Sequence, residues 1–366
     1  MRIARIIEYF PPHIGGMERH GLILSEEQIK LGHEVDVFIG CGDEKLLPKI
    51  YKMPLQFLPL YSKLRRFWFN FWASRMVVRN HKKSPYDIIH LHGDFVEAYF
   101  GGKLSKKLGI PSVLTVHAGL NKKHLRQKNR KFFDDISKII CVSREIADEL
   151  KIIDVAEEKI EIISSGIYLD EFENVDKNAV IDLRDKYSKP IIISVGVLRI
   201  NKGFNFLIDA FKKVVDIFPK AMLLIVGDGP ERDKLRRLAE DISGIIFLGK
   251  TDHNNVVKYL KAADVFVLAS VSTEGDREGT STSIMEAMAA GLPVVATKVG
   301  GNSYLIKEER NGLLVAEKDT KSLVETLIRL ATNENLCAAM NKNNLEDIKQ
   351  KDWPIIARKI TDVYVE

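Results

Sequence analysis

Hydrophobic positions fall into short runs that alternate with longer amphipathic segments along the whole chain. The runs are rich in Val, Ile and Leu and lack the strict apolar–polar alternation of a half-exposed strand. This pattern is typical of parallel strands buried between two layers of helices. It predicts strands over Arg2–Glu8, Glu34–Ile39, Ile88–His92, Ser112–His117, Ile139–Ser143, Ile160–Ile163, Ile191–Gly196, Met222–Val226, Ile245–Leu248, Val265–Ala269, Pro293–Thr297 and Gly312–Val315.

Helical patterns fill the intervals between these runs. Apolar residues recur at helical spacing over Gly203–Phe218, and Thr282–Ala290 and Trp353–Val365 are also predicted to be helical. A polar stretch near 171–189 interrupts the strand series, which then restarts. Since 366 residues exceed one ordinary core, we predict two α/β domains, each a doubly wound parallel sheet. Their expected extents are 1–170 and 171–350, with 351–366 as a helix that crosses back to the first domain.

Composition narrows the class of protein. The chain is 45% hydrophobic and 29% charged, as in globular proteins, and no apolar run is long enough to span a bilayer. Cys41, Cys141 and Cys337 lie too far apart for a disulfide framework or a zinc site. The N-terminal residues carry no signal-peptide pattern. We therefore expect a cytoplasmic protein.

The positive charge is concentrated in the first half. Residues 1–170 carry 27 Lys and Arg against 21 Asp and Glu, a net charge of +6, and residues 61–83 hold seven basic residues and no acid among several aromatic ones. Two interpretations stay open. Arg65, Arg66, Arg75 and Arg79 contact an anionic membrane peripherally, at its inner face, or the segment is a packed helix with solvated arginines.

Two carboxylates separated by seven residues, Glu278 and Glu286, bracket a predicted loop and helix start. Between them, Gly279, Thr280 and Ser281 are small enough for backbone N–H groups to approach an anion at the helix N-terminus. Carboxylates at both ends of such a turn accept hydrogen bonds from sugar or ribose hydroxyls. On spacing alone, an ordinary helix cap with an exposed Glu explains the pattern equally well.

Other candidate residues follow predicted strands. Gly15 and Gly16 lie between a strand and a helix, where a backbone without side chains can approach a diphosphate, although a plain turn has the same residues. His117 ends a strand and would face a ligand crevice, or else it is a structural histidine. Lys202, near a helix start, would stabilise diphosphate charge. No Asp-x-Asp pair is present, so no metal is expected.

The ordered set of motifs resembles the GT4 family of retaining glycosyltransferases, which have the GT-B fold. The Glu278–Glu286 segment matches the family's EX7E pattern, and the resemblance covers nearly the whole chain. Further matches follow in family order: Pro11–His20, Gly32–Val35, Asp87–His92, Thr115–His117, Val142–Ser143, Ser194–Gly196 with Lys202–Gly203, Val226–Pro230 and Ala263–Val267. The Val226–Pro230 loop lacks the third glycine of a dinucleotide fingerprint, which excludes a hydride-transfer enzyme.

The resemblance implies two Rossmann-like domains facing an interdomain cleft and transfer with retention at the anomeric carbon. It implies that Glu278 holds the donor-sugar hydroxyls, that Glu286 holds the ribose hydroxyls and that His117 positions the sugar. Lys202 and the Gly16 backbone would stabilise the leaving diphosphate. The chain departs from the family pattern at one cation. Family members commonly have an arginine directly after the glycine that corresponds to Gly196, whereas this chain has Val197 there. Arg199 would take the role of that arginine.

The expected donor is a nucleoside-diphosphate-sugar that carries a hexose-type sugar, with no further cofactor. The expected acceptor is a carbohydrate, a lipid-linked sugar or a small molecule, and nucleic acid is not expected as a partner. Two other classes stay open: a sugar-nucleotide hydrolase or epimerase on the same fold, and a non-catalytic, degenerate transferase-like binding protein. The sequence does not indicate the base, the sugar or the oligomeric state.

Overall fold

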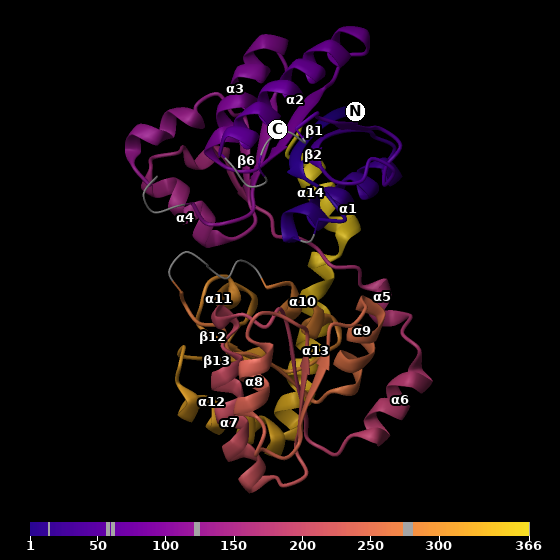
Figure 1. The fold of residues 1–366 in the computed structure, drawn as a ribbon, viewed down its shortest axis with the longest axis vertical. Coiled ribbons are helices and arrows are strands. Elements are labelled where there is room, and N and C mark those ends of the chain that lie inside the picture. The colour runs from indigo at the N-terminus through magenta and orange to yellow at the C-terminus, as the bar shows by residue number, and fades with distance from the viewer. Residues whose placement is uncertain (14, 56–58, 60–62, 121–124, 274–280, 366) are drawn as a thin grey trace. The chain divides into compact units, whose positions relative to one another are not determined.

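The computed structural model describes residues 1–366 except 14, 56–58, 60–62, 121–124, 274–280 and 366. The chain forms two compact units, labelled by element in Figure 1. Unit 1 comprises Met1–Gly166 with Trp353–Glu366, and unit 2 comprises Ile167–Asp352. The chain therefore passes between units at 166/167 and 352/353, close to the expected positions 170/171 and 350/351.

The described residues of unit 1 form a seven-stranded parallel sheet with the order β3-β2-β1-β4-β5-β6-β7. Six of these strands are the predicted ones, so the predicted doubly wound parallel sheet is confirmed for this unit. The additional strand, β3, lies at the sheet edge and has only three residues, too few to show a hydrophobic period. The strands are β1 (Arg2–Tyr9), β2 (Glu34–Cys41), β3 (Ile50–Lys52), β4 (Ile88–His92), β5 (Ser112–Val116), β6 (Lys138–Cys141) and β7 (Ile160–Ile162).

Helices cover both faces of this sheet because successive side chains of each strand point to opposite faces. On one face, Ala4 and Ile6 of β1 join a core with α2 and α3, which pack together. On the other face, Arg5 contacts α1 and Tyr364, which follows α14, and α1 and α14 also pack together (Figure 1). The helices of unit 1 are α1 (Gly16–Lys30), α2 (Lys63–Lys83), α3 (Phe95–Leu108), α4 (Arg144–Ile152) and α14 (Trp353–Asp362).

The C-terminal helix is anchored to unit 1 by buried polar contacts. The Tyr364 hydroxyl lies 2.6 Å from His90 Nδ1 and 3.1 Å from Gln28 Nε2, and Arg5 Nη2 lies 3.4 Å from the same oxygen. Gln28 Nε2 also donates to Thr361 Oγ1 at 2.9 Å. These bonds fix the last turn of the chain against the α1 face of the sheet.

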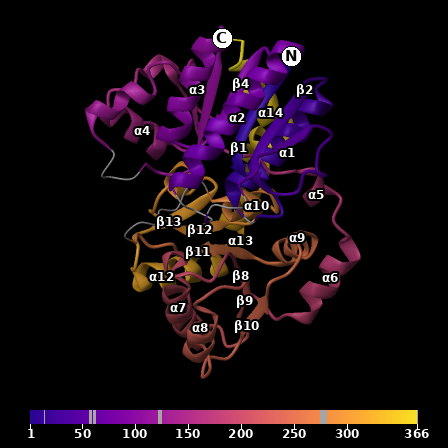
Figure 2. The same ribbon diagram turned by 45° about the horizontal axis from the view of Figure 1, so that its top comes forward.

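Unit 2 contains a six-stranded parallel sheet, also as predicted, with the order β10-β9-β8-β11-β12-β13 (Figure 2). Two hydrophobic clusters, one on each face, form its core. The strands are β8 (Ile191–Val195), β9 (Met222–Val226), β10 (Ile245–Gly249), β11 (Val265–Leu268), β12 (Val294–Thr297) and β13 (Gly312–Val315). The helices are α5 (Asp170–Glu173), α6 (Lys177–Lys186), α7 (Phe204–Ile217), α8 (Arg232–Leu238), α9 (His253–Ala262), α10 (Thr282–Ala289), α11 (Asn302–Leu305), α12 (Thr320–Thr332) and α13 (Glu334–Asp347).

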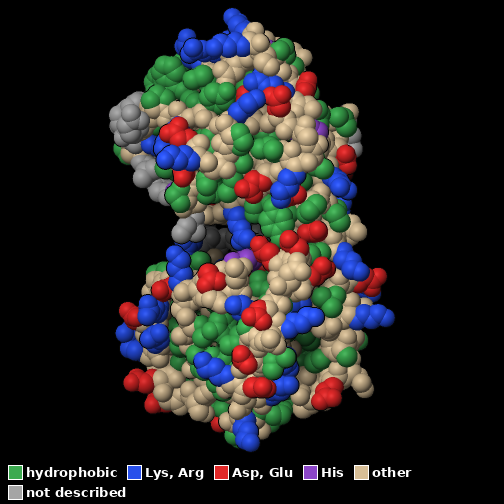
Figure 3. Space-filling view, turned by 90° about the vertical axis from the view of Figure 1, so that its right-hand side faces the viewer, with side chains coloured by type: hydrophobic (Ala, Val, Ile, Leu, Met, Phe, Trp, Pro, Cys, Tyr) green, Lys and Arg blue, Asp and Glu red, His purple; other side chains and the backbone are tan. Residues whose placement is uncertain are grey.

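The surface carries both signs of charge. On the face shown in Figure 3, Lys and Arg side chains alternate with Asp and Glu over each unit. Within the described residues, no helix has the length and hydropathy needed to cross a bilayer.

Candidate functional site

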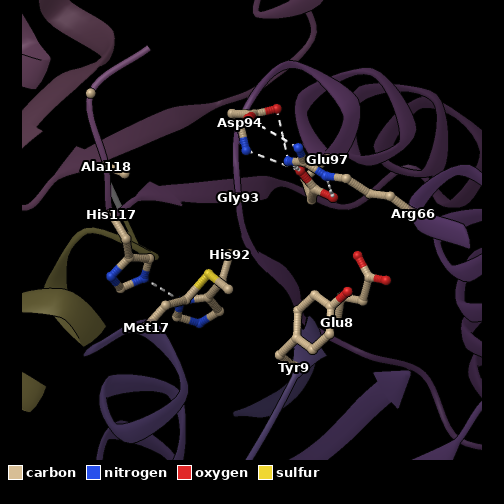
Figure 4. Close-up of a pocket in the computed structure, with 11 residues that line it drawn as sticks. Glu8, Tyr9, Met17, Arg66, His92, Gly93, Asp94, Glu97, His117 and Ala118 are labelled. Atoms are coloured by element: carbon tan, nitrogen blue, oxygen red, sulfur yellow. Dashed lines mark hydrogen bonds and ion pairs between the residues drawn. The ribbon is translucent and has the colours of Figure 1, made fainter. Parts of the chain in front are cut away.

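Unit 1 has a cavity at the point where its strand order reverses. β1 pairs with β2 on one side and with β4 on the other, and open α/β sheets bind ligands outside the carboxyl ends of such strands. Residues from these strand ends line a cavity of about 360 Å³: Glu8 and Tyr9 of β1, His92 of β4 and His117 after β5 (Figure 4). The sheet topology therefore brings His117, predicted as a site residue, to a ligand-sized cavity.

Three histidines from different elements meet beside this cavity. His92 Nδ1 lies 2.9 Å from His117 Nε2, and the two rings stack with centroids 5.2 Å apart. The His20 ring, from α1, stands edge-on to His117 at 4.7 Å, and His20 Nδ1 lies 2.9 Å from Ser165 Oγ. We call His20, His92 and His117 the imidazole cluster. Sequence reasoning identified His117 but missed His20, because helix α1 brings it in from a distant part of the chain.

Burial keeps the imidazole cluster uncharged. It lowers the pKa of His117 to about 3 and, with help from neighbouring imidazoles and Arg5, lowers the pKa of His20 and His92 well below the ordinary value. At neutral pH each ring therefore has one lone pair and one N–H group, and in the His92–His117 hydrogen bond one ring donates and the other accepts.

The opposite wall of the cavity is acidic. Burial, with a smaller contribution from the Glu97 charge, raises the pKa of Glu8 to about 7. Arg66 donates to Glu97 Oε1 at 2.9 Å and to Asp94 Oδ2 at 3.0 Å, so its charge is already balanced by two carboxylates. Figure 4 shows this group and Glu8 on the same side of the cavity. A wall with more acceptor oxygens than free donors suits a ligand that presents hydroxyl groups.

Two arginines of α2, Arg65 and Arg66, bind groups within the protein. Arg65 is 4% exposed and donates to the carbonyl oxygens of Leu55 and Gly40 at 2.8 and 3.0 Å. Arg66 forms the ion pairs described above. The interpretation that Arg65 and Arg66 meet lipid phosphates is therefore wrong. Arg75 and Arg79 lie on the exposed side of the same helix. The charge pattern alone did not distinguish this pair from Arg65 and Arg66.

The glycine pair starts helix α1 in unit 1. Gly15 has an extended backbone, and a Cβ built on it would meet the Glu18 carboxylate at 2.0 Å, whereas a Cβ on Gly16 would meet nothing within 4 Å. Glu18, in the first turn of α1, is buried and lies 3.1 Å from His13 Nδ1. This carboxylate complements the positive end of the helix. The expectation that Gly15 and Gly16 approach a diphosphate remains a prediction.

Unit 2 repeats the topological switch between β8 and β11. The loop after β8 carries Arg199, which is exposed, and Lys202, which is half-buried. This loop is tied to the one after β11, since Val271 N donates to Asn201 O at 2.8 Å. Gly203 has a φ of 64°, and a Cβ there would lie 1.9 Å from Ala269 O, so only glycine fits. The two predicted cations thus lie on a loop packed against the start of the segment that leads to Glu278.

The residues that follow β11 are described in part. Glu278, Gly279 and Thr280 lie outside the described residues. Ser281 is 4% exposed and immediately precedes α10, and Glu286, on α10, is 7% exposed. His253 Nδ1 lies 3.8 Å from Glu286 Oε1, and His253 Nε2 lies 2.6 Å from Glu171 Oε2. Sequence reasoning missed His253 and Glu171.

Comparison with known proteins covers both units. Residues 14–171 match the family described as Glycosyltransferase Family 4, and residues 179–347 match Glycosyl transferases group 1. An uncharacterized glycosyltransferase of Methanocaldococcus jannaschii is 29% identical over 100% of this chain and 98% of its own length. Alpha-monoglucosyldiacylglycerol synthase of Acholeplasma laidlawii is 26% identical over 100% of this chain and 97% of its own length.

Solved structures share the fold. HepE of Anabaena, crystallised in complex with UDP, superimposes with a TM-score of 0.82 at 20% sequence identity over 100% of both chains. WaaG, a glycosyltransferase involved in lipopolysaccharide biosynthesis, gives a TM-score of 0.71 at 20% identity over 99% of both chains. The two parallel-sheet units, the paired family matches and these relatives together show that the chain belongs to the GT4-type glycosyltransferases with the GT-B fold.

Proposed function

We propose that this glycosyltransferase moves a hexose-type sugar from a nucleoside-diphosphate-sugar to a hydroxyl-bearing acceptor, with retention at the anomeric carbon and without a metal ion. The observation that carries the proposal is the position of the predicted residues. His117 of unit 1 follows the carboxyl end of β5, next to β4 of the switch point, and Arg199 and Lys202 of unit 2 follow the carboxyl end of β8, at the switch point of that sheet. Support from relatives comes from HepE, whose structures are in complex with UDP and with UDP-glucose.

The chemical roles follow from charge and protonation. Lys202, Arg199 and the Gly15–Gly16 backbone stabilise the negative charge that develops on the leaving diphosphate, a task that otherwise falls to a metal. Ser281, with Gly279 and Thr280, offers backbone N–H groups at the start of α10, and Glu278 and Glu286 accept hydrogen bonds from donor hydroxyls. His117, kept neutral by burial, accepts a hydrogen bond from the sugar.

The unit 1 cavity is the proposed acceptor pocket. Neutral imidazoles on one wall, and Glu8 with the Arg66–Glu97 pair on the other, offer mainly acceptor atoms, which suit the hydroxyls of a carbohydrate. Relatives named alpha-monoglucosyldiacylglycerol synthase and phosphatidyl-myo-inositol mannosyltransferase bear names that specify lipid acceptors. A sugar or polyol headgroup on a lipid is therefore the acceptor class that we test first.

The first experiment is calorimetric unfolding with UDP, GDP or ADP in the presence of EDTA. We expect one nucleoside diphosphate to stabilise the protein, since a ligand that binds only the folded state raises the unfolding temperature. The sugar conjugates of that nucleotide are then assayed with EDTA present, and NMR of the product gives its anomeric configuration. An inverted product, or activity that requires added magnesium, would contradict the proposal. Absence of stabilisation by any of the nucleotides, with or without magnesium, would favour a non-catalytic binding protein.

Glu278→Gln tests the donor site directly. Loss of a charge-assisted hydrogen bond to the sugar costs about 1.5–3 kcal/mol, so we expect kcat/KM to fall about ten- to hundredfold. Glu325→Gln is the matched control, because Glu325 is a 65% exposed carboxylate on α12. Equal activities of the two variants would remove Glu278 from the donor site.

We also propose peripheral contact between α2 and an anionic membrane. Leu64 is 57%, Phe67 47% and Trp72 39% exposed, and at about 100° per residue they fall within one arc of roughly 140° around α2. Arg75 and Arg79 continue the exposed side toward the basic C-terminal end of the helix. Tyr99, 39% exposed on the neighbouring α3, extends the apolar area. Exposed aromatic rings beside cations are typical of a helix that binds an anionic interface.

Cosedimentation with vesicles measures this contact. We expect binding to phosphatidylglycerol vesicles and little binding to phosphatidylcholine vesicles. Arg75→Gln with Arg79→Gln should weaken the partition several-fold, since each basic residue near the surface contributes about 1 kcal/mol. Trp72→Ala should also weaken it, whereas Ile217→Ala, which removes an exposed apolar side chain from unit 2, is the control. Equal binding to both vesicle types would remove the electrostatic part of the proposal.

A further inference from the structure

The imidazole cluster has the composition of a transition-metal site. Its three residues each offer one ring nitrogen, and these nitrogens all lie within 4.8 Å of one another. Four-coordinate zinc with ligands at about 2.0–2.1 Å needs nitrogens roughly 3.4 Å apart, so the nitrogens that now lie up to 4.8 Å apart must approach by as much as roughly 1.4 Å. They come from α1, the end of β4 and the residue after β5.

Two buried nitrogens in the cluster lack a partner. His20 is 1% and His92 2% exposed, and within the described part of the chain neither His20 Nε2 nor His92 Nε2 has a hydrogen-bond partner. A buried polar atom without a partner is destabilising, so most such atoms in folded proteins are hydrogen-bonded. In the tautomer that places the proton on Nδ1, each of these nitrogens presents a lone pair, which a bound ion would satisfy.

The surroundings decide which ion fits. Burial keeps all three rings neutral, as metal ligation requires. Imidazole nitrogens suit zinc, copper and nickel, whereas calcium and magnesium take oxygen ligands. Ser165 Oγ lies 2.9 Å from His20 Nδ1 and thus orients the His20 ring in the way that outer partners orient metal-bound histidines.

Entry and charge balance also favour a cation. His92 and His117 line the cavity, so an ion reaches the cluster through it. Among the described residues that line the cavity, Glu8, Asp94 and Glu97 face one cation, Arg66, which makes the approach acidic on balance. One opposing charge, Arg5, lies behind the cluster at 3.4 Å from His90 Nδ1 and limits the affinity.

We propose that His20, His92 and His117 bind Zn²⁺ or a similar transition-metal ion, with the remaining coordination position open to the cavity. Binding is reversible and inhibits the enzyme, because it engages the lone pair that His117 offers to the donor sugar. The inhibition rests on the proposed function, whereas the metal site itself does not.

Cobalt is the first probe, because Co²⁺ in a four-coordinate site has strong visible absorption bands and needs no substrate or variant. We expect one equivalent of CoCl₂ added to the purified full chain to produce these bands, and ZnCl₂ to abolish them by displacement. Calorimetric titration with ZnCl₂ then gives the affinity. Absence of the cobalt bands together with absence of zinc binding would overturn the proposal, while glycosyl transfer in EDTA would stand unaffected.

Two variants locate the site. His20→Gln should weaken zinc binding about a hundredfold, and Ser165→Ala, which removes only the partner of the His20 ring, about tenfold. His33→Gln, which removes an imidazole from the turn after α1, is the control and should bind zinc like the parent protein. Unchanged zinc affinity in folded His20→Gln and Ser165→Ala would place the ion elsewhere and contradict the proposal. In the transfer assay, zinc should inhibit the parent protein reversibly, and an equal zinc sensitivity of Ser165→Ala would contradict inhibition through this site.

Discussion

Glu8 is an acid held in an environment that disfavours its charge. Only 7% of the residue is exposed, and the Glu97 carboxylate adds repulsion, so the pKa of Glu8 rises from its ordinary value of 4.5 to about 7. Between these values the folded protein binds more protons than the unfolded chain, and stability therefore falls as the pH rises through this window. The full shift corresponds to roughly 3 kcal/mol, and solvent in the cavity reduces the effect to about half.

Glu8→Gln should remove the loss of stability that ionisation of Glu8 causes at higher pH. We expect the free energy of unfolding of unit 1 at pH 8 to rise by about 1.5 kcal/mol, and the gain to shrink toward zero at pH 5. Urea titration followed by tryptophan fluorescence measures it, because the three tryptophans, Trp68, Trp72 and Trp353, all lie in unit 1. Glu34→Gln is the control, since a hydrogen bond from Lys49 lowers the pKa of Glu34 instead. A gain that is the same at pH 5 and pH 8 would exclude titration of Glu8 as its cause.

At the scale of a single element, α14 shows how a short helix is held by polar contacts. Ile356, Ala357 and Ile360 bury its apolar face. Beyond its last turn, the Tyr364 hydroxyl meets Gln28, His90 and Arg5, of which Arg5 is fully buried. Burial lowers the pKa of Arg5, and its hydrogen bonds to Ser25 and Gln28 provide acceptors for the guanidinium. The end of the chain therefore completes a polar network in the core.

Tyr364→Phe should lower the free energy of unfolding strongly, although it removes only one hydroxyl group. Removal of one hydroxyl leaves buried donors and acceptors on Gln28, His90 and Arg5 without that partner, and we expect a loss of about 2–3 kcal/mol in the free energy of unfolding of unit 1. The tryptophan-based urea titration again measures it. Tyr304→Phe, at a residue 50% exposed on unit 2, should leave this transition unchanged. A loss below about 0.5 kcal/mol would show that water replaces the hydroxyl.

At the scale of the whole molecule, the two units should respond differently to acid. Among the described residues of unit 1, burial lowers the pKa of His20, His90, His92 and His117, and also that of the part-exposed His33. In the unfolded chain these rings take up protons as the pH falls through about 6.5, whereas in the folded unit they stay neutral, so acid favours unfolding.

Each such ring lowers the free energy of unfolding by up to about 1.4 kcal/mol per pH unit below 6.5. Glu8, whose pKa is raised, has the opposite effect and cancels the contribution of about one ring. We therefore expect unit 1 to lose several kcal/mol between pH 7 and pH 5. Tryptophan fluorescence follows unit 1, while calorimetry records both units. His90→Asn should reduce by about one the number of protons that unit 1 takes up on unfolding in acid. A tryptophan transition that does not change with pH over this range would contradict the shifted pKa values.

Sequence patterns predicted the elements well, for a physical reason. Strands such as Met222–Val226 and Ile88–His92 are buried on both faces, so a continuous apolar run marks them from local information alone. The helix Thr282–Ala289 was located in the same way from its position between a loop and Gly291. Among the strands of the described residues, only the edge strand Ile50–Lys52 was not predicted, because three partly exposed residues are too few to show a hydrophobic period.

The sequence by itself thus determined the two-sheet α/β class, the family and the strand ends that hold His117, Arg199 and Lys202, because burial and motif order are written along the chain. Only the tertiary structure decided which side chains meet in unit 1. His20, His92 and His117 come together, and Glu8 comes to face Arg66 and Glu97, because the sheet places β1 beside β4. The same packing decided that Arg65 and Arg66 bind within the protein while Arg75 and Arg79 remain on the surface. Contacts between residues far apart in sequence depend on strand order and helix placement, and no local pattern encodes them.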